Sequence, residues 1–379
     1  MAKLGEVCIQ ITDGSHNPPS GVEQSEYLML SSKNIDDDFI TLDSPRFLSH
    51  SDYIAENKRT TVSEGDLLMT IVGTIGRVAI VPEELKGICL QRSVAVIKPE
   101  RKVVNNRYLM YQLQNMRPFL EKEARGVAQK GIYLKQVSQL DIKLPELEHQ
   151  VQIVKVLDKA SKLIFLRRQQ LAKLDELVKA RFVEMFETRK YPIEKLGRVC
   201  EKITDGTHKT PTYLDSGIKF ISAKNIIDGK VDLTDTKYIS KNEYQEIQKR
   251  CQVEIQDILL TKSGTLGIPA IIRTDCALGL FESLAVIKYD RSKLLPYFLY
   301  EQLRCNRVQR QFKAGTKGVA VMHLHLGVIS DIDIIVPPIS YQLEFSDFAE
   351  QVDKQKQTVQ QSLDKLELMK KALMQEYFG

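Results

Sequence analysis

From Glu146 to Tyr191 the sequence contains no glycine and no proline, although the chain has 20 and 13 of these residues. Apolar residues recur in this stretch every seven positions, at Leu157, Ile164, Leu171, Val178 and Met185. A seven-residue apolar period predicts a long helix that packs against another long helix. The alternative is an ordinary core helix, but such helices usually span only about 8–20 residues.

A second stretch of the same kind runs from Ser340 to Phe378. It also lacks glycine and proline, and its seven-residue seam consists of Val352, Val359, Leu366 and Leu373. Each stretch follows a strand-like segment that ends in proline, Pro145 in the first case and Pro337 in the second. The chain is therefore predicted to alternate twice between a globular domain and a long helix, and the two helices are predicted to pair.

Length and composition exclude several classes of protein. A chain of 379 residues suggests two or three domains, and no apolar run approaches the ~18 residues of a membrane span. The beginning of the sequence has no apolar core like that of a signal peptide, and the six cysteines form no CxxC pair. We expect a cytoplasmic protein without a zinc site, a disulfide framework or a membrane contact. The net charge of +5 permits nucleic-acid binding but does not require it.

The first half of the sequence recurs in the second half. Asp13 of an Ile-Thr-Asp-Gly-Ser-His segment is matched 192 positions later by Asp205 of Ile-Thr-Asp-Gly-Thr-His. Other segments match in the same order at offsets of 190 to 192, and these pairs are 3–8 with 195–200, 32–35 with 223–226, 70–76 with 261–267, and 93–98 with 283–288. Gln150 and Gln342 open the two long stretches, again 192 positions apart. The chain is therefore a tandem duplication of one domain-plus-helix unit.

The repeated segments predict the fold class. Turns with Gly, capping boxes and short buried strands indicate mixed α+β domains of about 145 residues, a size that supports its own core. Two such units joined head to tail, with their helices paired antiparallel, would have pseudo-twofold symmetry. The predicted boundaries are 1–145 for the first domain, 146–190 for the first helix, 191–337 for the second domain and 338–379 for the second helix.

The segments between the matches differ between the two copies. Residues 17–27 correspond to 209–217, Arg77 to Ile268, and Gln91-Arg92 to Phe281-Glu282. One frame with two sets of loops is what a pair of readers with separate specificities would have. Neutral drift of loops after a duplication is the alternative.

The sequence contains no catalytic constellation. Asn17-Pro-Pro-Ser20 resembles the Asn-Pro-Pro-aromatic segment of adenine methyltransferases, but a serine replaces the aromatic ring, and a proline-rich turn is the better interpretation. The Gly-Thr-x-Gly segments at 73–76 and 264–267 predict tight turns, although exposed N–H groups there could hold a phosphate. His323-Leu-His325 has no companion ligands, and no ATP-binding loop is present. We expect neither an enzyme nor a metal site.

This layout resembles the DNA-specificity subunit of type I restriction–modification systems, over the whole chain. The resemblance is carried by the Leu-Gly…Thr-Asp-Gly-Ser/Thr-His openings at 4–16 and 196–208, the Lys-Asn-Ile segments, the Thr-x-x-Gly-Thr-x-Gly turns, the Leu-Pro and Val-Pro exits, and Gln150 and Gln342. Together these features are specific, whereas any one alone would be weak.

The resemblance implies that each domain is a target-recognition domain that reads one half of an interrupted site in double-stranded DNA. It implies that the helices form an antiparallel coiled coil that holds the domains at a fixed separation. Two adenine methyltransferase subunits would dock beside the helices and bring S-adenosylmethionine, so this chain itself would carry no cofactor. A restriction and translocation subunit would then join the complex. Because the loops differ, the two half-sites should differ as well.

Candidate DNA contacts are cations and hydroxyl or imidazole groups in turns or variable segments. They are Ser15, His16, Lys33, Arg77 and Arg92 in the first domain, and Thr207, His208, Lys224, Lys262 and Lys317 in the second. Arginine can read guanine through two hydrogen bonds, whereas lysine more often binds phosphate. For each residue the alternative is a solvated surface group. Two other functions stay open: a scaffold protein whose domains bind other proteins, and a self-contained DNA methyltransferase, against which Ser20 argues.

Overall fold

The computed structural model describes residues 1–124, 131–316 and 323–379. The chain divides into two compact units. The first comprises Met1–Arg167 together with Ser362–Gly379, and the second comprises Arg168–Gln361. Each unit therefore contains one globular domain and a part of both long helices. The boundaries predicted from the sequence separate the domains from the helices, which is a different division from these two units, and they stay a prediction.

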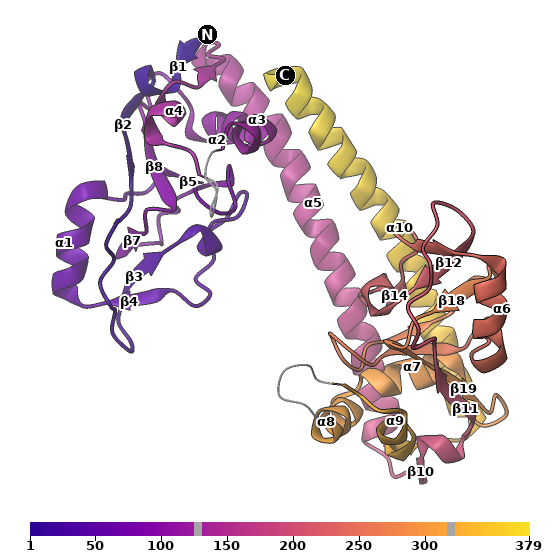
Figure 1. Ribbon diagram of the computed structural model, residues 1–379. Helices are drawn as coiled ribbons and strands as arrows, with labels where there is room; N and C mark the ends of the chain where they lie inside the picture. Colours follow the sequence, from indigo (N-terminus) through magenta and orange to yellow (C-terminus); the bar gives the residue numbers. More distant parts are fainter. Residues whose placement is uncertain (125–130, 317–322) are drawn as a thin grey trace. The chain divides into compact units, whose positions relative to one another are not determined.

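The first domain is built on two small sheets (Figure 1). The four-stranded antiparallel sheet has the order β2 (Cys8–Asp13), β8 (Val94–Pro99), β5 (Leu67–Thr70), β6 (Val78–Ile80). The three-stranded sheet has the order β4 (Arg46–Leu48), β3 (Tyr27–Leu30), β7 (Ile88–Leu90), and β3 is parallel to β7. Every residue of β5 is buried, which explains why Leu67, Leu68 and Met69 follow one another without a polar residue between them.

The second domain repeats this arrangement. Its sheets have the orders β11 (Cys200–Asp205), β19 (Leu284–Tyr289), β16 (Ile258–Thr261), β17 (Pro269–Ile271), and β15 (Lys237–Ile239), β12 (Ile218–Ile221), β18 (Leu278–Leu280). The register irregularity in β2 after Cys8 recurs in β11 after Cys200. The duplication seen in the sequence is thus a duplication of topology. The hairpin of β13 (Ile226–Ile227) and β14 (Lys230–Val231) corresponds in the first domain to a single antiparallel bridge between Ile35 and Ile40.

Helices and short pairs of strands complete each domain. The first has α1 (His50–Thr60), α2 (Asn106–Asn115), α3 (Arg117–Glu123), α4 (Leu134–Ser138), the 3-10 turns η1 (Leu4–Glu6) and η2 (Ser32–Asn34), and the pair β1 (Ala2–Lys3) with β9 (Asp141–Ile142). The second has α6 (Lys241–Arg250), α7 (Pro296–Arg304), α8 (Asn306–Gly315), α9 (Leu326–Asp331), the 3-10 turns η4 (Leu196–Arg198) and η5 (Ala223–Asn225), and the pair β10 (Ile193–Lys195) with β20 (Asp333–Ile335).

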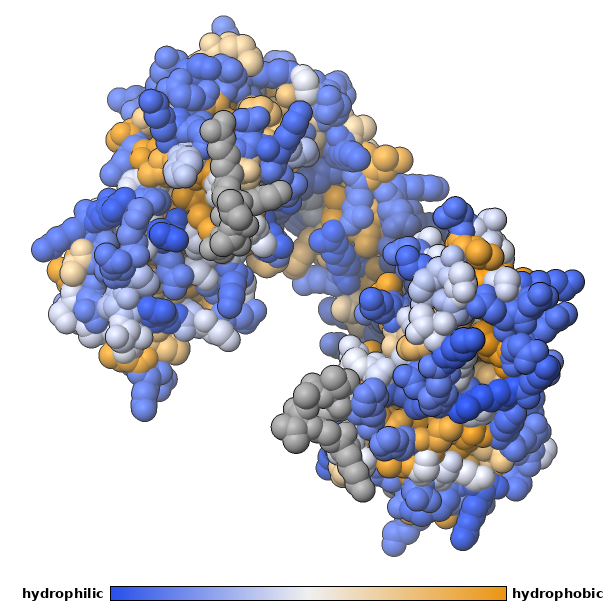
Figure 2. Space-filling view, in the orientation of Figure 1, coloured by the Kyte–Doolittle hydropathy of each residue, from blue (hydrophilic) through white to orange (hydrophobic). Residues whose placement is uncertain are grey.

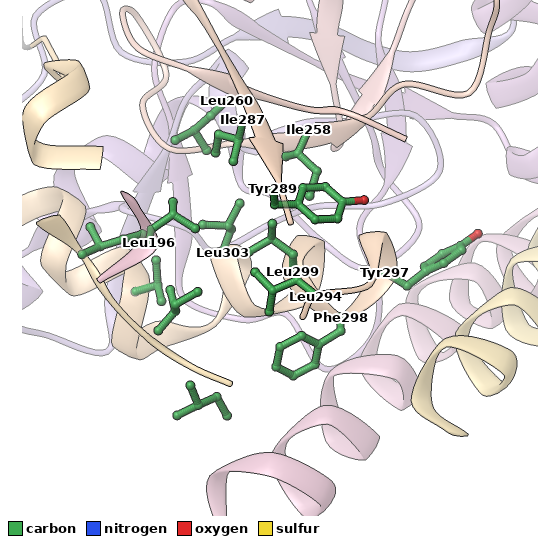
Figure 3. Close-up of a cluster of buried hydrophobic side chains, with 14 of the residues drawn as sticks. Leu196, Ile258, Leu260, Ile287, Tyr289, Leu294, Tyr297, Phe298, Leu299 and Leu303 are labelled. Atoms are coloured by element: carbon green, nitrogen blue, oxygen red, sulfur yellow. The ribbon is translucent and has the colours of Figure 1, made fainter. Parts of the chain in front are cut away.

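The second domain's core forms between its four-stranded sheet and α7. Figure 3 shows Ile258, Leu260 and Ile287 of the sheet facing Leu299 and Leu303 of the helix. All five side chains are fully buried. Burying them provides roughly 1.5–3 kcal/mol each.

The two long helices are α5 (Leu147–Phe182), which continues as the π-helical turn η3 (Val183–Glu187), and α10 (Ile339–Phe378). In the first unit, residues near the start of α5 share a core with residues near the end of α10; they are Ile153, Val154, Leu157, Met374 and Phe378. In the second unit the relation is reversed, because Phe182 and Phe186 share a core with Phe345, Ala349 and Val352. The helices therefore run antiparallel. The predicted fold class, two similar α+β domains that are each followed by a long helix of an antiparallel pair, is confirmed.

The predicted seam residues are covered. Leu157, Ile164, Val178, Val352 and Val359 are buried. Leu171, Leu366 and Leu373 are half-buried. A seven-residue period thus identified the covered face of both helices.

Each domain is fixed to its own helix by a buried glutamine. The side-chain amide of Gln150 accepts a hydrogen bond from Asn105 N at 2.8 Å and donates to Val103 O and Pro145 O. Gln342 makes the matching bonds to Leu295 N, Lys293 O and Pro337 O. Both side chains are fully buried. The repeated glutamine therefore has a structural role: its hydrogen bonds fix the start of the helix to the backbone of the domain.

Candidate nucleic-acid interface

The Thr-Asp-Gly segment makes a turn that only glycine permits. A Cβ atom at Gly14 would lie 2.0 Å from Leu90 O, and one at Gly206 would lie 2.1 Å from Leu280 O. This close approach allows Ser15 N to donate to Leu90 O at 2.7 Å. The turn thus lies directly on the end of β7 in the first domain and on the end of β18 in the second.

The Asp of this segment anchors a cluster of charged side chains in the first domain. Asp13 is 7% exposed and accepts hydrogen bonds from His16 Nε2, at 2.9 Å, and from the guanidinium of Arg59. Arg59 belongs to the last turn of α1, whose start is capped by Ser49. The imidazole and the guanidinium are each about half exposed, so the buried carboxylate holds two polar groups at the surface.

The second domain repeats this cluster and adds a cation. Asp205 is 2% exposed and is paired with Arg250, His208 and Lys262. Burial opposes its ionisation, but hydrogen bonds from Lys262 and Arg250 outweigh burial and keep its pKa below the ordinary value. The first domain has the buried Ile71 at the position of Lys262. The two clusters therefore share an Asp, a His and an Arg but differ in charge.

Other predicted contact residues lie beside these clusters. Lys33 and Lys224 are exposed on η2 and η5, whose backbones are held by Ser93 Oγ and Ser283 Oγ at 3.1 and 3.0 Å. Arg92 precedes Ser93 directly and is exposed. The predicted residues that converge are thus Ser15, His16, Lys33 and Arg92 in the first domain, and Thr207, His208, Lys224 and Lys262 in the second.

The predicted residues differ in accessibility. Ser15 is buried, and the Lys262 side chain is 12% exposed with its ammonium on Asp205, so in this structure both are positioned to hold the turn. Thr207 Oγ1 accepts from Lys209 N at 3.1 Å. Arg77 lies 3.5 Å from Asp36 and is part of a different loop. Lys317 lies outside the described residues.

The variable loops 17–27 and 209–217 are each held by a cation at the start of a strand. In the first domain the guanidinium of Arg46 donates to Pro19 O. At the matching position of the second domain, Lys237 Nζ lies 5.9 Å from the centre of the Tyr213 ring. The Asn17-Pro-Pro-Ser20 segment thus belongs to a clamped loop, in line with its interpretation as a turn.

The Gly-Thr-x-Gly segments are tight turns closed by a threonine. Thr70 Oγ1 donates to Thr74 O and accepts from Arg77 N, and Thr261 repeats both bonds in the second domain. Gly73 and Gly76 have φ values of 83° and 81°, where a side chain would be strained. The repeated threonine and glycines therefore follow from the turn.

Sequence reasoning missed Arg59 and Arg250, which belong to the clusters, and it noted Glu282 only as part of a segment that differs between the copies. A signal was present for the arginines, because they stand 191 positions apart within two short helices that the repeat aligns. In the described part of the chain, no group of three or more His, Cys, Asp or Glu side chains is arranged to hold a metal ion. None of the described helices has the length and apolar character of a membrane span.

The long helices carry apolar residues on their outer surface. Figure 2 shows apolar side chains among polar ones over these helices. Those on α5 that are more than two-fifths exposed are Val156, Leu163, Phe165, Leu166 and Leu177. Isolated exposed apolar residues are common, whereas a contiguous apolar patch is typical of a surface that binds another protein.

Comparison with known proteins identifies relatives of this chain. The family model of the type I restriction modification DNA specificity domain matches twice, over residues 29–176 and 190–368. The chain is 37% identical over 100 residues to the type I restriction enzyme EcoBI specificity subunit of Escherichia coli, a match that spans 26% of this chain but only 21% of that protein. It is 21% identical over 340 residues to the MjaVIII specificity subunit of Methanocaldococcus jannaschii, covering 84% of this chain and 79% of the relative.

Two solved structures share the fold over the whole chain. One, from work on complex assembly and conformational transition of the type I restriction–modification system, has a TM-score of 0.55 at 18% identity and is covered to 96%. The other is the specificity subunit of a type I system from M. genitalium, with a TM-score of 0.54 at 13% identity and 95% coverage. Since the family model matches most of the sequence and does so once in each half, the chain belongs to the type I restriction modification DNA specificity family and contains its domain twice.

Proposed function

We propose that this chain is the sequence-reading subunit of a type I restriction–modification complex, in which each domain reads one half of an asymmetric, interrupted DNA site. The observation that carries the proposal is a shared frame with unlike surfaces. Both domains have the same sheet orders, the same Thr-Asp-Gly turn and the same Asp–His–Arg cluster, yet the variable loops and the residues next to the turn differ. Two versions of one reader in one chain fit a site with two different halves.

The clusters fit a division of labour between DNA backbone and bases. Half-exposed arginine and histidine side chains at the surface suit phosphate oxygens, which fix position and orientation without reporting sequence. Sequence would be read by side chains that differ between the domains, since only these can give the two halves different targets.

The paired helices would set the distance between the half-sites and bind partner subunits. A buried glutamine fixes each domain to its helix, so the length of the helices would set the distance between the two half-sites on the DNA. The exposed apolar residues of α5 offer a surface for two adenine methyltransferase subunits, and those subunits would bring S-adenosylmethionine and the base-flipping site. A restriction and translocation subunit would complete the complex. Catalysis would lie in the partners and not in this chain.

The test is to express this chain with an adenine methyltransferase subunit from the same operon and to map methyladenine in the host DNA. We expect a two-part, asymmetric, interrupted motif that requires both chains. Methylation by this chain alone would show instead that it is itself a methyltransferase. If both proteins are soluble and associated but no motif appears, the chain is a scaffold rather than a reader.

Salt dependence provides an independent measurement on the purified complex. A reader that binds phosphates through Lys and Arg loses affinity steeply as salt rises, whereas a scaffold has no such DNA affinity.

A further inference from the structure

Arg92 in the first domain and Glu282 in the second have the same backbone hydrogen bonding to the Thr-Asp-Gly turn. In the first domain Arg92 N donates to Ser15 O at 2.9 Å, and in the second Glu282 N donates to Thr207 O at 3.0 Å. The preceding residues form matching parallel bridges, Ser15 with Gln91 and Thr207 with Phe281. Positions 92 and 282 are therefore equivalent, and each lies directly beside its Asp–His–Arg cluster.

Opposite charges occupy this equivalent position. Arg92 is exposed, and within the described residues no carboxylate pairs with its guanidinium. Glu282 is held in place, because one carboxylate oxygen lies 2.8 Å from His208 Nδ1. His208 Nε2 in turn lies 3.1 Å from the guanidinium of Arg250. Nε2 also lies 3.3 Å from the carboxylate of Asp205, so His208 orients Glu282 and links it to the buried aspartate of the cluster.

A second difference accompanies the first. The domain with Glu282 has Lys262 beside Asp205, where the other domain has Ile71. The extra cation balances the extra carboxylate. The surface beside the turn thus presents a carboxylate in the second domain and a guanidinium in the first.

A carboxylate in a DNA-binding surface is repelled by phosphates, so its favourable partners on the DNA are hydrogen-bond donors of the bases. Those donors are the amino groups of cytosine and adenine, which carboxylates accept in the major groove. A guanidinium at the same position matches the N7 and O6 acceptors of guanine. The same place in the frame would therefore select different bases.

We propose that positions 92 and 282 are matched specificity-determining positions: Arg92 reads guanine in the first half-site, and Glu282, oriented by His208, reads the amino group of cytosine or adenine in the second. This inference rests on the function proposed above. Asp13 and Asp205 are positioning residues that hold the turn and act through it.

The experiment uses the full chain co-expressed with its methyltransferase subunit, and it compares R92Q with E282Q by mapping methyladenine genome-wide. R92Q is expected to lower the preference for guanine at one position of the first half-site by roughly tenfold or more, with the second half-site unchanged. E282Q is expected to change one position of the second half-site by a similar factor, with the first unchanged. Each half-site is thus the control for the other.

E246Q is the matched control, because Glu246 lies on the outer side of α6, is 71% exposed and pairs only with Lys249 in the described structure. It is expected to leave both half-sites as in the wild type. Co-purification with the methyltransferase subunit checks that each variant folds. R92Q tests the proposal even if E282Q does not fold, since among the described residues Arg92 is bonded to the frame through its backbone.

Two results would overturn the proposal. Either variant could leave both half-sites unchanged, or it could weaken methylation evenly at all sites, as the loss of a phosphate contact would. If the wild-type pair yields no two-part motif, the proposed function fails instead, and the two failures are therefore distinguishable.

Discussion

Asp205 shows how a buried charge organises a surface. Its carboxylate is almost inaccessible, yet it is held ionised by Lys262 and Arg250, and its pKa is lowered despite burial. A carboxyl group with a lowered folded-state pKa contributes stability above its ordinary pKa of about 3.9, and this contribution is lost as the pH falls through the folded-state value. At neutral pH the contribution is fully present.

Replacing Asp205 with Asn should destabilise the second domain by about 2 kcal/mol at pH 7, because Lys262 and Arg250 lose their counter-ion. Thermal unfolding of the full chain at pH 7 measures this. D13N is the matched control and should cost less, since Asp13 pairs with one guanidinium and a histidine rather than with two cations and a histidine. Equal losses in D205N and D13N would contradict the explanation.

Glu301 on α7 is the opposite case. It is 5% exposed, and burial raises its pKa, although Arg304 partly compensates. A carboxyl group with a raised folded-state pKa favours the native state while it is protonated. Its ionisation therefore removes stability as the pH rises from the ordinary value of about 4.3 through the folded-state value.

Replacing Glu301 with Gln should therefore raise the melting temperature relative to the wild type at pH 8 and have a smaller effect at pH 4. The physical reason is that a neutral amide of the same shape avoids burying a charge. Melting curves of both proteins across this pH range are the measurement. A variant that is less stable at pH 8 would show that the ion pair with Arg304 outweighs burial.

At this scale the sequence predicted part of the candidate site. The Thr-Asp-Gly-Ser/Thr-His segments directed attention to His16 and His208, but their partners Arg59 and Arg250 stand 46 and 45 residues from the aspartates. Nothing local joins them. Only the packing of α1 and α6 against the sheets closes that distance, so these contacts required the three-dimensional structure.

At the scale of elements, the seven-residue period predicted both long helices and their covered faces. It did not predict the π-helical turn at Val183–Glu187. Over only five residues, the apolar pattern of a π-helix does not differ from that of an α-helix. The short strands were harder still: β1 has only two residues, and its pairing with β9 connects parts of the chain 138 residues apart at Lys3 and Asp141.

The Thr-Asp-Gly turn offers a test at this scale. Replacing Gly14 with Ala should destabilise the first domain by about 3 kcal/mol or more, because the new methyl group would overlap Leu90 O. Urea unfolding followed by circular dichroism is the measurement. Gly327 is the matched control, since a Cβ there meets nothing within 4 Å, and G327A should be neutral or slightly stabilising. A tolerated G14A would refute the steric role of the turn.

For the whole molecule, the sequence predicted that the two long helices pair antiparallel, and the structure shows which core the end of each helix joins. Phe182 at the end of α5 and Phe186 in η3 stand 192 positions before Met374 and Phe378 of α10. The ring of Phe186 packs edge-on against the ring of Phe298 in the second unit, with 4.8 Å between the ring centres. In the first unit the ring of Phe378 packs edge-on against Tyr108, with 5.3 Å between the ring centres. The end of each helix thus completes the core of the domain that precedes the other helix.

A chain of residues 1–190 should therefore form a homodimer in which α5 of each copy takes the place of α10 for the other. With the methyltransferase subunit, this dimer should direct methylation to an interrupted palindrome, since both readers are then the same. Light scattering gives the oligomeric state and methyladenine mapping the target.

The control is the same fragment with F186A, which should dimerise more weakly because it lacks the aromatic ring that would fill the place of Phe378. A monomeric wild-type fragment, or an asymmetric target, would refute the exchange.

The sharing of α10 by both units also has a consequence for the order in which the protein can fold during synthesis. The first domain is made first, but Met374 and Phe378 belong to its core, so that core stays incomplete until nearly all of the chain described here has been translated. The second domain takes Phe182 and Phe186 from a helix already made. Although domains usually mature in the order of synthesis, here the first domain would be finished last, and its exposed core would depend on chaperones for longest.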